Sequence, residues 1–181
     1  FIEQRYQEAI DAYYAVLARY PEYPESIMAV ENIASCYLDL ILETEDAKKK
    51  EELRDDADAV EGYISERFAG AKDTALMVAA GDATIRLAAK EAQYKNLARA
   101  DWLYTEFFTN YRRHTLAATL AASKAGEMQK AERWEDALKY WQVVAAVYTN
   151  SPHYASALAQ ISRCSGKLGN KKDEIGYITK Y

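Results

Sequence analysis

The residues suited to metal or nucleophilic chemistry are few and far apart. The chain has two histidines, His114 and His153, and two cysteines, Cys36 and Cys164. A zinc site needs three or four His, Cys or carboxylate ligands brought together. Neither histidine lies near a cysteine or a carboxylate at ligand spacing, so the sequence predicts no metal site and no cofactor.

No arrangement typical of an active site appears either. The chain lacks G-x-S-x-G, H-E-x-x-H, P-loop and dinucleotide-binding glycine motifs. The acidic pairs Asp55-Asp56 and Glu135-Asp136 are neighbours in sequence, whereas a general acid and its base must face each other across a cleft. The run from Lys48 to Glu52 places opposite charges three and four residues apart, which suits a solvated helix face. We expect that the protein is not an enzyme.

Composition favours an almost entirely helical protein. Of 181 residues, 50% are hydrophobic, and only seven are glycine and three are proline. Alanine and leucine are strong helix formers, and residues that break helices are scarce. No apolar run reaches the length of about 18 residues that a membrane span needs. The first residue is Phe rather than Met, so we expect a piece of a longer protein.

Charge is distributed unevenly along the chain. Residues 1–75 hold 18 acidic and 8 basic side chains, whereas residues 76–181 hold 10 acidic and 15 basic ones. Ordinary solvated surface explains this pattern, and so does steering of a partner or head-to-tail contact between an acidic and a basic end. The basic excess is too small and too dispersed to indicate nucleic-acid binding.

One pattern recurs four times. An aromatic residue follows an alanine by eleven positions, so that both lie at one helical phase. The pairs are Ala9 and Tyr20, Ala57 and Phe68, Ala100 and Tyr111, and Ala137 and Tyr148. Recurrence of one supersecondary unit predicts a repeat array, which buries its core between neighbouring units and offers long faces to partners. Cys36 and Cys164 each lie sixteen residues after an anchor, in repeats that are not adjacent, so both are predicted to be free thiols.

The fourth unit shows its construction most clearly. In residues 118–151, Ala121, Ala125 and Met128 share one stripe of a first helix. Trp134, Ala137, Leu138, Trp141 and Val144 share one stripe of a second helix. The polar segment AERWED separates the two stripes, which predicts an antiparallel helix pair.

This unit resembles the tetratricopeptide repeat. Ala125 and Ala137 match the family's two small positions, and Met128 and Trp141 match bulky ones, whereas Val144 replaces the usual alanine. The resemblance implies an all-α, right-handed αα superhelix of about four and a half antiparallel helix pairs, forming a single domain over residues 1–181. Helices are predicted at residues 3–20, 25–43, 51–69, 72–91, 95–111, 115–131, 133–149, 152–168 and 171–181.

The anchors are 48, 43 and 37 residues apart. The extra residues of the first two intervals fall in 43–56 and 90–96, which lack Gly and Pro, so they predict longer helices rather than loops. The second and third repeats fit less well. Asp82 occupies a small-residue site, and Gly81 lies beside it.

The turns RYPEYPES and VYTNSPHYA resemble those of bacterial envelope tetratricopeptide proteins, including outer-membrane assembly lipoproteins and Tol–Pal-associated periplasmic proteins. This resemblance favours the periplasm or the cell envelope, and the compartment and the oligomeric state stay open. Pro24 and Pro152 are predicted in the first turn of the helix that follows each turn.

In the resembled family, the first helix of each pair lines a concave groove that binds a partner. Its exposed phase maps here to a set of residues rich in small side chains: Met28, Glu31, Ser35 and Leu38; Leu76, Ala79, Ala83 and Arg86; Thr119, Ala122, Gly126 and Gln129; and Ser156, Ala159, Arg163 and Gly166. Such a wall suits a helix or an extended peptide. Tight packing between successive helices explains the same small residues. The Lys/Asn clamp for a carboxylate tail is not present, because Glu31, Ala79 and Ala122 occupy its position.

Most of the fifteen tyrosines lie in phase with the predicted core. Tyr14, Tyr23, Tyr140 and Tyr154 lie off the anchor stripe or in turns, so those of them that are exposed are better interface candidates. The first functional hypothesis is a scaffold that binds a peptide or helix of a protein partner. The others are a structural subunit of a bacterial envelope assembly and a docking or regulatory domain of a larger enzyme.

Overall fold

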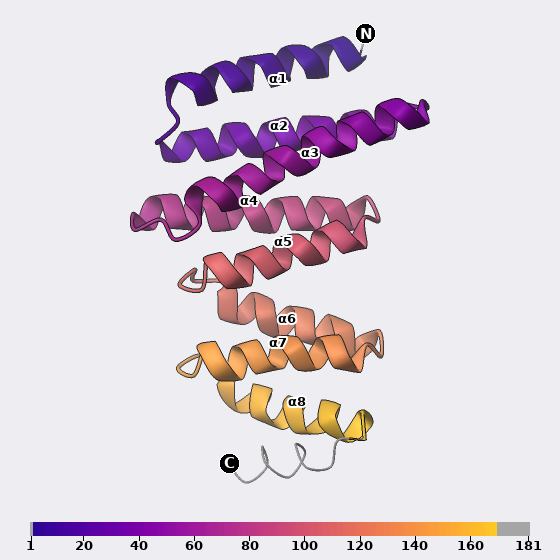
Figure 1. Ribbon diagram of the computed structural model, residues 1–181. Helices are drawn as coiled ribbons and strands as arrows, with labels where there is room; N and C mark the ends of the chain where they lie inside the picture. Colours follow the sequence, from indigo (N-terminus) through magenta and orange to yellow (C-terminus); the bar gives the residue numbers. More distant parts are fainter. Residues whose placement is uncertain (1, 170–181) are drawn as a thin grey trace. The chain divides into compact units, whose positions relative to one another are not determined.

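The computed structural model describes residues 2–169 and contains eight α-helices and no strand in that span (Figure 1). They are α1 (Ile2–Arg19), α2 (Pro24–Glu43), α3 (Ala47–Phe68), α4 (Thr74–Gln93), α5 (Leu97–Asn110), α6 (Ala117–Lys130), α7 (Trp134–Val147) and α8 (Tyr154–Lys167). The all-α prediction is confirmed. The largest error in a helix boundary is at α3, which begins at Ala47 rather than at residue 51. The helix predicted at 171–181 lies outside the described residues.

The chain divides into two compact units, one ending at His114 and the other beginning at Thr115. The first contains α1 to α5, and the second contains α6 to α8. No helix in the described part of the chain is long and apolar enough to cross a membrane.

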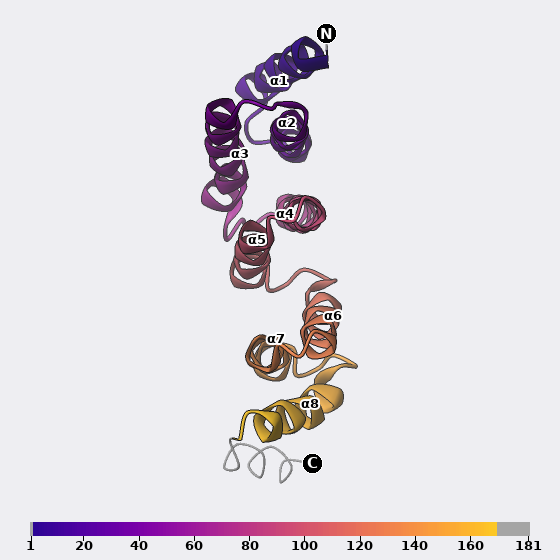
Figure 2. The ribbon, with the colours of Figure 1, turned by 90° about the vertical axis from the view of Figure 1, so that its right-hand side faces the viewer.

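Within each unit, helices that follow one another in sequence pack together. The pairs α2–α3, α4–α5 and α6–α7 form as predicted, α1 packs on α2, and α7 packs on α8. In the first unit, α2 also packs against α4, the first helix of the next pair. Figure 2 shows α2 and α4 on one side of this unit and α3 and α5 on the other.

The repeated alanines face the helix interfaces. Ala57, Ala100 and Ala137 are buried, as are the anchors Phe68 and Tyr111. Burial raises the pKa of Tyr111 to about 12, and its hydroxyl donates to the Ile64 carbonyl at 3.4 Å. The alanine-and-ring pattern therefore marks a packing seam, as expected from its phase.

The extra residues between the first anchors lengthen helices. Helices α2, α3 and α4 have 20, 22 and 20 residues, whereas α5 to α8 have 14 each. A short link at Thr44–Asp46 is the one interruption of residues 43–56, and Asp46 there accepts hydrogen bonds from the first turn of α3. Asp73 caps α4 in the same way.

Two expectations about local structure need correction or confirmation. Pro24 begins α2, as predicted. Pro152 lies before α8, which begins only at Tyr154, so its predicted place in the first turn is wrong. The turn continues through His153, whose carbonyl accepts from the Ala157 N–H at 2.8 Å.

The third repeat is shifted in phase by one residue. Gly81, not Asp82, occupies the site for a small side chain, because a Cβ on Gly81 would lie 2.7 Å from Cδ2 of His114 and 3.3 Å from the Phe107 ring. Asp82 consequently lies at the edge, with Oδ1 3.2 Å from Nε2 of His114. His114 thus lies near a carboxylate after all, one that is distant in sequence.

Candidate partner-binding groove and buried ion network

Several predicted groove residues of the first unit meet between α2 and α4. Arg86 donates to both carboxylate oxygens of Glu31, with Nε–Oε1 at 2.6 Å and Nη2–Oε2 at 2.7 Å. This pairing is the main reason why the pKa of Arg86 is raised. A two-point guanidinium–carboxylate pair has fixed geometry. Glu31 and Arg86 therefore form part of the wall of this face and bind each other.

A second polar group lies further along the same face. Asp39 pairs with Lys90 at 2.9 Å and accepts from the Tyr94 hydroxyl at 2.5 Å. Lys90 also donates to the Ser35 carbonyl at 3.0 Å. Burial, followed by the bond to Asp39, raises the pKa of Tyr94 to about 12.

The structure removes two residues from the predicted surface. Ala83 and Leu38 are fully buried, so neither reaches a partner. Ala83 is buried because of the one-residue phase shift at Gly81. Leu38 lies on the apolar side of α2, next to Ala34 and Tyr37, which are buried as well. Met28 is the most exposed of the predicted set in α2, and Leu76 and Ala79 are half-buried.

In the second unit, two predicted residues of α6, Gln129 and Thr119, contact polar side chains outside the predicted set, Gln160 and His153. Gln129 donates to Gln160 at 2.8 Å and accepts from the Trp141 indole at 3.2 Å. Thr119 lies 3.3 Å from the ring of His153. Ala122 is half-buried, and Ser156 and Arg163 are exposed.

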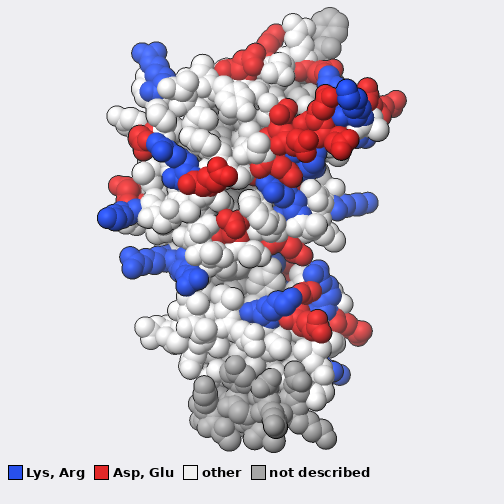
Figure 3. Space-filling model, viewed as in Figure 1, with Lys and Arg blue, Asp and Glu red and all other residues white. Residues whose placement is uncertain are grey.

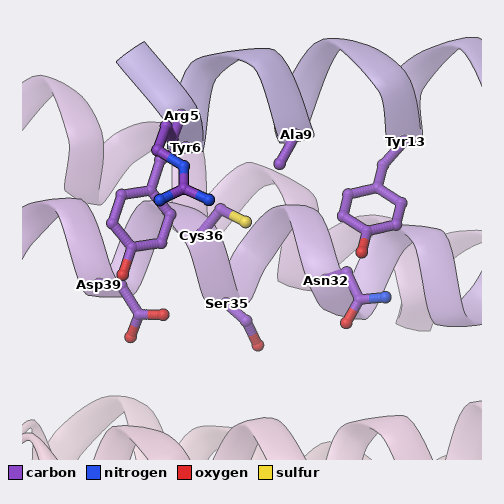
Figure 4. Close-up of a pocket in the computed structure, with 8 residues that line it drawn as sticks. All are labelled: Arg5, Tyr6, Ala9, Tyr13, Asn32, Ser35, Cys36 and Asp39. Carbon is purple, nitrogen blue, oxygen red and sulfur yellow. The ribbon is translucent and has the colours of Figure 1, made fainter. Parts of the chain in front are cut away.

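A groove opens between α1 and α2 (Figure 4). It encloses about 460 Å³ and is lined by residues of both helices: Arg5, Tyr6, Ala9 and Tyr13 from α1, and Asn32, Ser35, Cys36 and Asp39 from α2. Only Ser35 of these belongs to the surface predicted from sequence. The α1 wall was missed because the resemblance assigned exposure to the first helix of each pair, whereas α1 is a second helix.

The groove offers hydrogen-bonding groups and rings rather than a reactive centre. Burial raises the pKa of Cys36, and Asp39 raises it further, so the thiol stays protonated and is a poor nucleophile. Burial likewise raises the pKa of Tyr6, with Asp39 and Glu43 adding to the effect. The neutral hydroxyls, the Asn32 amide and the tyrosine rings suit recognition of a polypeptide. Both cysteines are free, as predicted.

A network of buried charges lies elsewhere in the first unit, between α3, α4 and α5. Glu61 and Glu91 are fully buried. Arg99 donates to Glu61 at 2.6 Å and to the Asp58 carbonyl at 2.7 Å, and Arg54 binds Glu91. Asp58, Glu61 and Glu91 place one oxygen each within 4.8 Å of one another.

The charges of this network are only partly compensated by its arginines. Three carboxylates face two guanidinium groups, and a buried ion pair is tolerated only when its charges are compensated. Burial, the largest cause, raises the pKa of Glu61 to about 7 against the opposing effect of Arg99. Arg54 and Arg99 each bind one of the buried glutamates, whereas Oε1 of Glu61 and Oε2 of Glu91 are buried without a hydrogen-bond partner among the described residues.

No family model, curated protein or solved structure matches this chain.

One signal in the sequence marks the buried network. Seven residues before each anchor, the chain has Tyr13, Tyr104 and Trp141 in three repeats and Glu61 in the other. A carboxylate at a ring position of a buried stripe requires a buried cation. The sequence does not show that Arg54 and Arg99 supply it, because they lie on different helices.

Proposed function

We propose that this chain is a non-catalytic protein–protein interaction scaffold whose α1–α2 groove binds a polypeptide segment of a partner. The supporting observation is the open, preformed groove of about 460 Å³, whose walls are two packed helices. Rings, amide and hydroxyl groups converge there without a nucleophile of lowered pKa. Such a site favours recognition over catalysis.

We further propose that the helix pairs form a right-handed superhelix of the tetratricopeptide type. The alanine-and-ring seam, the antiparallel pairs and the packing of α2 on α4 support this arrangement. In such an array, the first helices of successive pairs form one continuous face. The ion pair of Glu31 with Arg86 lies on that face and fixes it.

Selection of ligands from a random peptide library tests the scaffold function. Ser35 is half-buried in the groove wall, so Ser35→Arg should fill the groove and weaken selected ligands about tenfold or more. Ser123→Arg, at an exposed site of α6, is the matched control and should have no effect. Ser35 is a better site for this test than Arg86, because Arg86→Glu would place its carboxylate against that of Glu31 and destabilise the face.

The alternative functions predict a different result. A subunit held permanently in an assembly, or a docking domain for an attached enzyme, needs no free peptide in this groove. Ligands that bind the wild type and the Ser35→Arg variant equally would contradict the proposed site.

A further inference from the structure

The packing seam of α1 is open where the same seam is buried on other helices. We define the ring stripe as the residues 11, 7 and 4 positions before each anchor, with the anchor itself. On α1 the ring stripe is Ala9, Tyr13, Val16 and Tyr20. Val16 is 40% exposed and Tyr20 45% exposed. At the position of Val16, Ile64, Phe107 and Val144 are at most 1% exposed. At the position of Tyr20, Phe68 and Tyr111 are at most 3% exposed, and Tyr148 is half-buried.

The covered stripes show what fits against them. On α5, Phe107 packs against Gly81 of α4, where an added Cβ would lie 3.3 Å from the ring. On α7, the Trp141 indole donates to Gln129 of α6 at 3.2 Å. Helix α6 turns three fully buried alanines inward, Ala117, Ala121 and Ala125. In both cases the cover is an antiparallel helix with small residues on the facing side, which lets the two backbones approach closely.

The groove described above continues this open stripe onto a second wall. Ala9 and Tyr13 belong to both the stripe and the groove, and Asn32, Ser35 and Cys36 of α2 form the opposite wall (Figure 4). A helix on the α1 stripe would therefore also contact α2. Helix α2 shows the same arrangement: it packs on α3, the second helix of its own pair, and also on α4, the first helix of the next pair.

The charge around the groove indicates the polar face of such a helix. Residues 1–46 contain ten Asp and Glu residues and only two Arg residues. Four of these acids, Glu3, Glu22, Glu31 and Asp39, pair with cations of later helices. Six acids and two arginines then remain in this segment, and one of these arginines, Arg5, lines the groove. Figure 3 shows red atoms gathered over α1 to α3, with blue atoms among them. A basic ligand is favoured electrostatically.

Exposed aromatic rings mark the far end of the stripe. Tyr20 and Tyr23 form a T-shaped pair with centroids 5.9 Å apart. Tyr23 is 60% exposed and Tyr14 is 41% exposed, whereas the other two interface candidates, Tyr140 and Tyr154, are half-buried. Tyrosine is enriched in protein interfaces because its large ring ends in a hydroxyl.

We propose that the α1–α2 groove and the ring stripe of α1 together seat an amphipathic helix of a partner protein. This helix runs antiparallel to α1, turns small residues at every fourth position toward Ala9 and Val16, and carries Lys or Arg on its flanks. The inference rests on the proposed function and specifies the kind of partner.

A peptide copied from α6 tests this inference, because α6 covers the equivalent stripe of α7. The probe is residues 115–131 with Glu127→Lys, labelled with a fluorophore and added to the full chain. We expect saturable binding by anisotropy, a gain of helical circular dichroism and weaker binding at higher NaCl. Val16→Glu should weaken binding about tenfold or more. Ala18→Glu, on the exposed opposite side of α1, should leave binding unchanged.

A probe with Ala121→Glu should also fail to bind, because its small-residue row is interrupted. Equal binding to the wild type and to Val16→Glu, or no binding at all, would overturn the helical partner. If library ligands then still respond to Ser35→Arg, the scaffold function stands and only the helix is wrong. If Val16→Glu does not weaken binding of the α6 peptide and Ser35→Arg does not weaken binding of library ligands, both proposals fail. A dimer in sedimentation that Val16→Glu dissociates would show a second copy as the occupant and overturn the partner helix.

Discussion

Glu61 shows how one residue departs from an otherwise regular seam. It occupies on α3 the position at which α5 has Tyr104 and α7 has Trp141, and all three are buried. The carboxylate is retained there because Arg99 binds it at 2.6 Å. The cost of burial appears in its pKa, which is raised to about 7. Such a group makes stability depend on pH.

The expected dependence follows from the sign of this pKa change. The folded chain holds the Glu61 proton more tightly than the unfolded chain, whose pKa is near 4.5. The stabilisation of the folded chain by the protonated Glu61 carboxyl is complete below about pH 4.5, declines as the pH rises toward 7 and is lost above that. The difference corresponds to about 3 kcal/mol. Glu61→Gln should remove this decline between pH 5 and 7, measured by urea unfolding. An unchanged slope in the variant would contradict the assignment.

Gly81 and Gly126 offer a matched pair at the same scale. An added Cβ at Gly81 would lie 2.7 Å from the buried His114 ring. An added Cβ at Gly126 would have no neighbouring atom of the described residues within 4 Å outside its own helix backbone. Gly81→Ala should therefore lower the free energy of unfolding by about 1–3 kcal/mol. Gly126→Ala should raise it by up to about 1 kcal/mol through helix propensity. Thermal unfolding compares the two, and a stabilising Gly81→Ala would show that His114 moves aside freely.

At the scale of elements, α1 and α7 carry the same stripe in different surroundings. Val16 and Val144 have the same place in the repeat, yet only Val144 is fully buried. The difference arises because α7 is covered by α6 and packs on α8, whereas α2 is the main packing partner of α1 and α3 reaches α1 through the ion pair of Lys49 with Glu3. Burial of a valine depends on its neighbours as much as on its own helix.

This contrast predicts unequal costs for the same substitution. Val144→Ala should lower the free energy of unfolding by about 1–3 kcal/mol, because it removes buried methyl groups and leaves a cavity. Val16→Ala should change it by less than about 0.5 kcal/mol, as expected for an exposed site. Chemical unfolding of both variants measures the difference. Equal losses would indicate that the α1 stripe is already covered in solution.

At the scale of the whole molecule, three buried polar contacts of the first compact unit join residues of that unit only. In this unit, Tyr111 bonds to Ile64, His114 lies beside Asp82, and Arg99 binds Glu61. All of these residues precede Thr115, where the second unit begins. The charge excess of residues 1–46 belongs entirely to the first unit.

We therefore expect that residues 1–114 fold without the second unit. A fragment ending at His114 should keep helical circular dichroism, unfold cooperatively and reproduce the amide chemical shifts of α2 to α4 in the full chain. Cooperative unfolding is expected because the core residues Ile33, Leu87 and Phe107 are fully buried within this unit. A gradual unfolding transition, together with loss of the dispersed amide chemical shifts, would contradict independent folding of this fragment.

The sequence alone determined the helices and the stripe of each helix that is suited to burial. Ala57, Ala100 and Ala137 are buried as predicted, because periodicity of 3.6 residues is a local property that needs no knowledge of neighbours. It also accounted for the long α2, α3 and α4. The sequence predicted that Ala83 is exposed, whereas it is buried. The close contact of Gly81 with His114, which sets the phase of α4, is a tertiary contact and cannot be seen in local spacing.

Only the tertiary structure decided which partners the polar groups obtain and which seam stays open. The pairing of Glu61 with Arg99, of His114 with Asp82 and of Glu31 with Arg86 joins residues 38, 32 and 55 positions apart. The repeat pattern is identical in form on α1 and α7, so it does not distinguish an exposed stripe from a covered one. Exposure is a property of neighbouring helices, and the neighbours are set by packing rather than by local spacing.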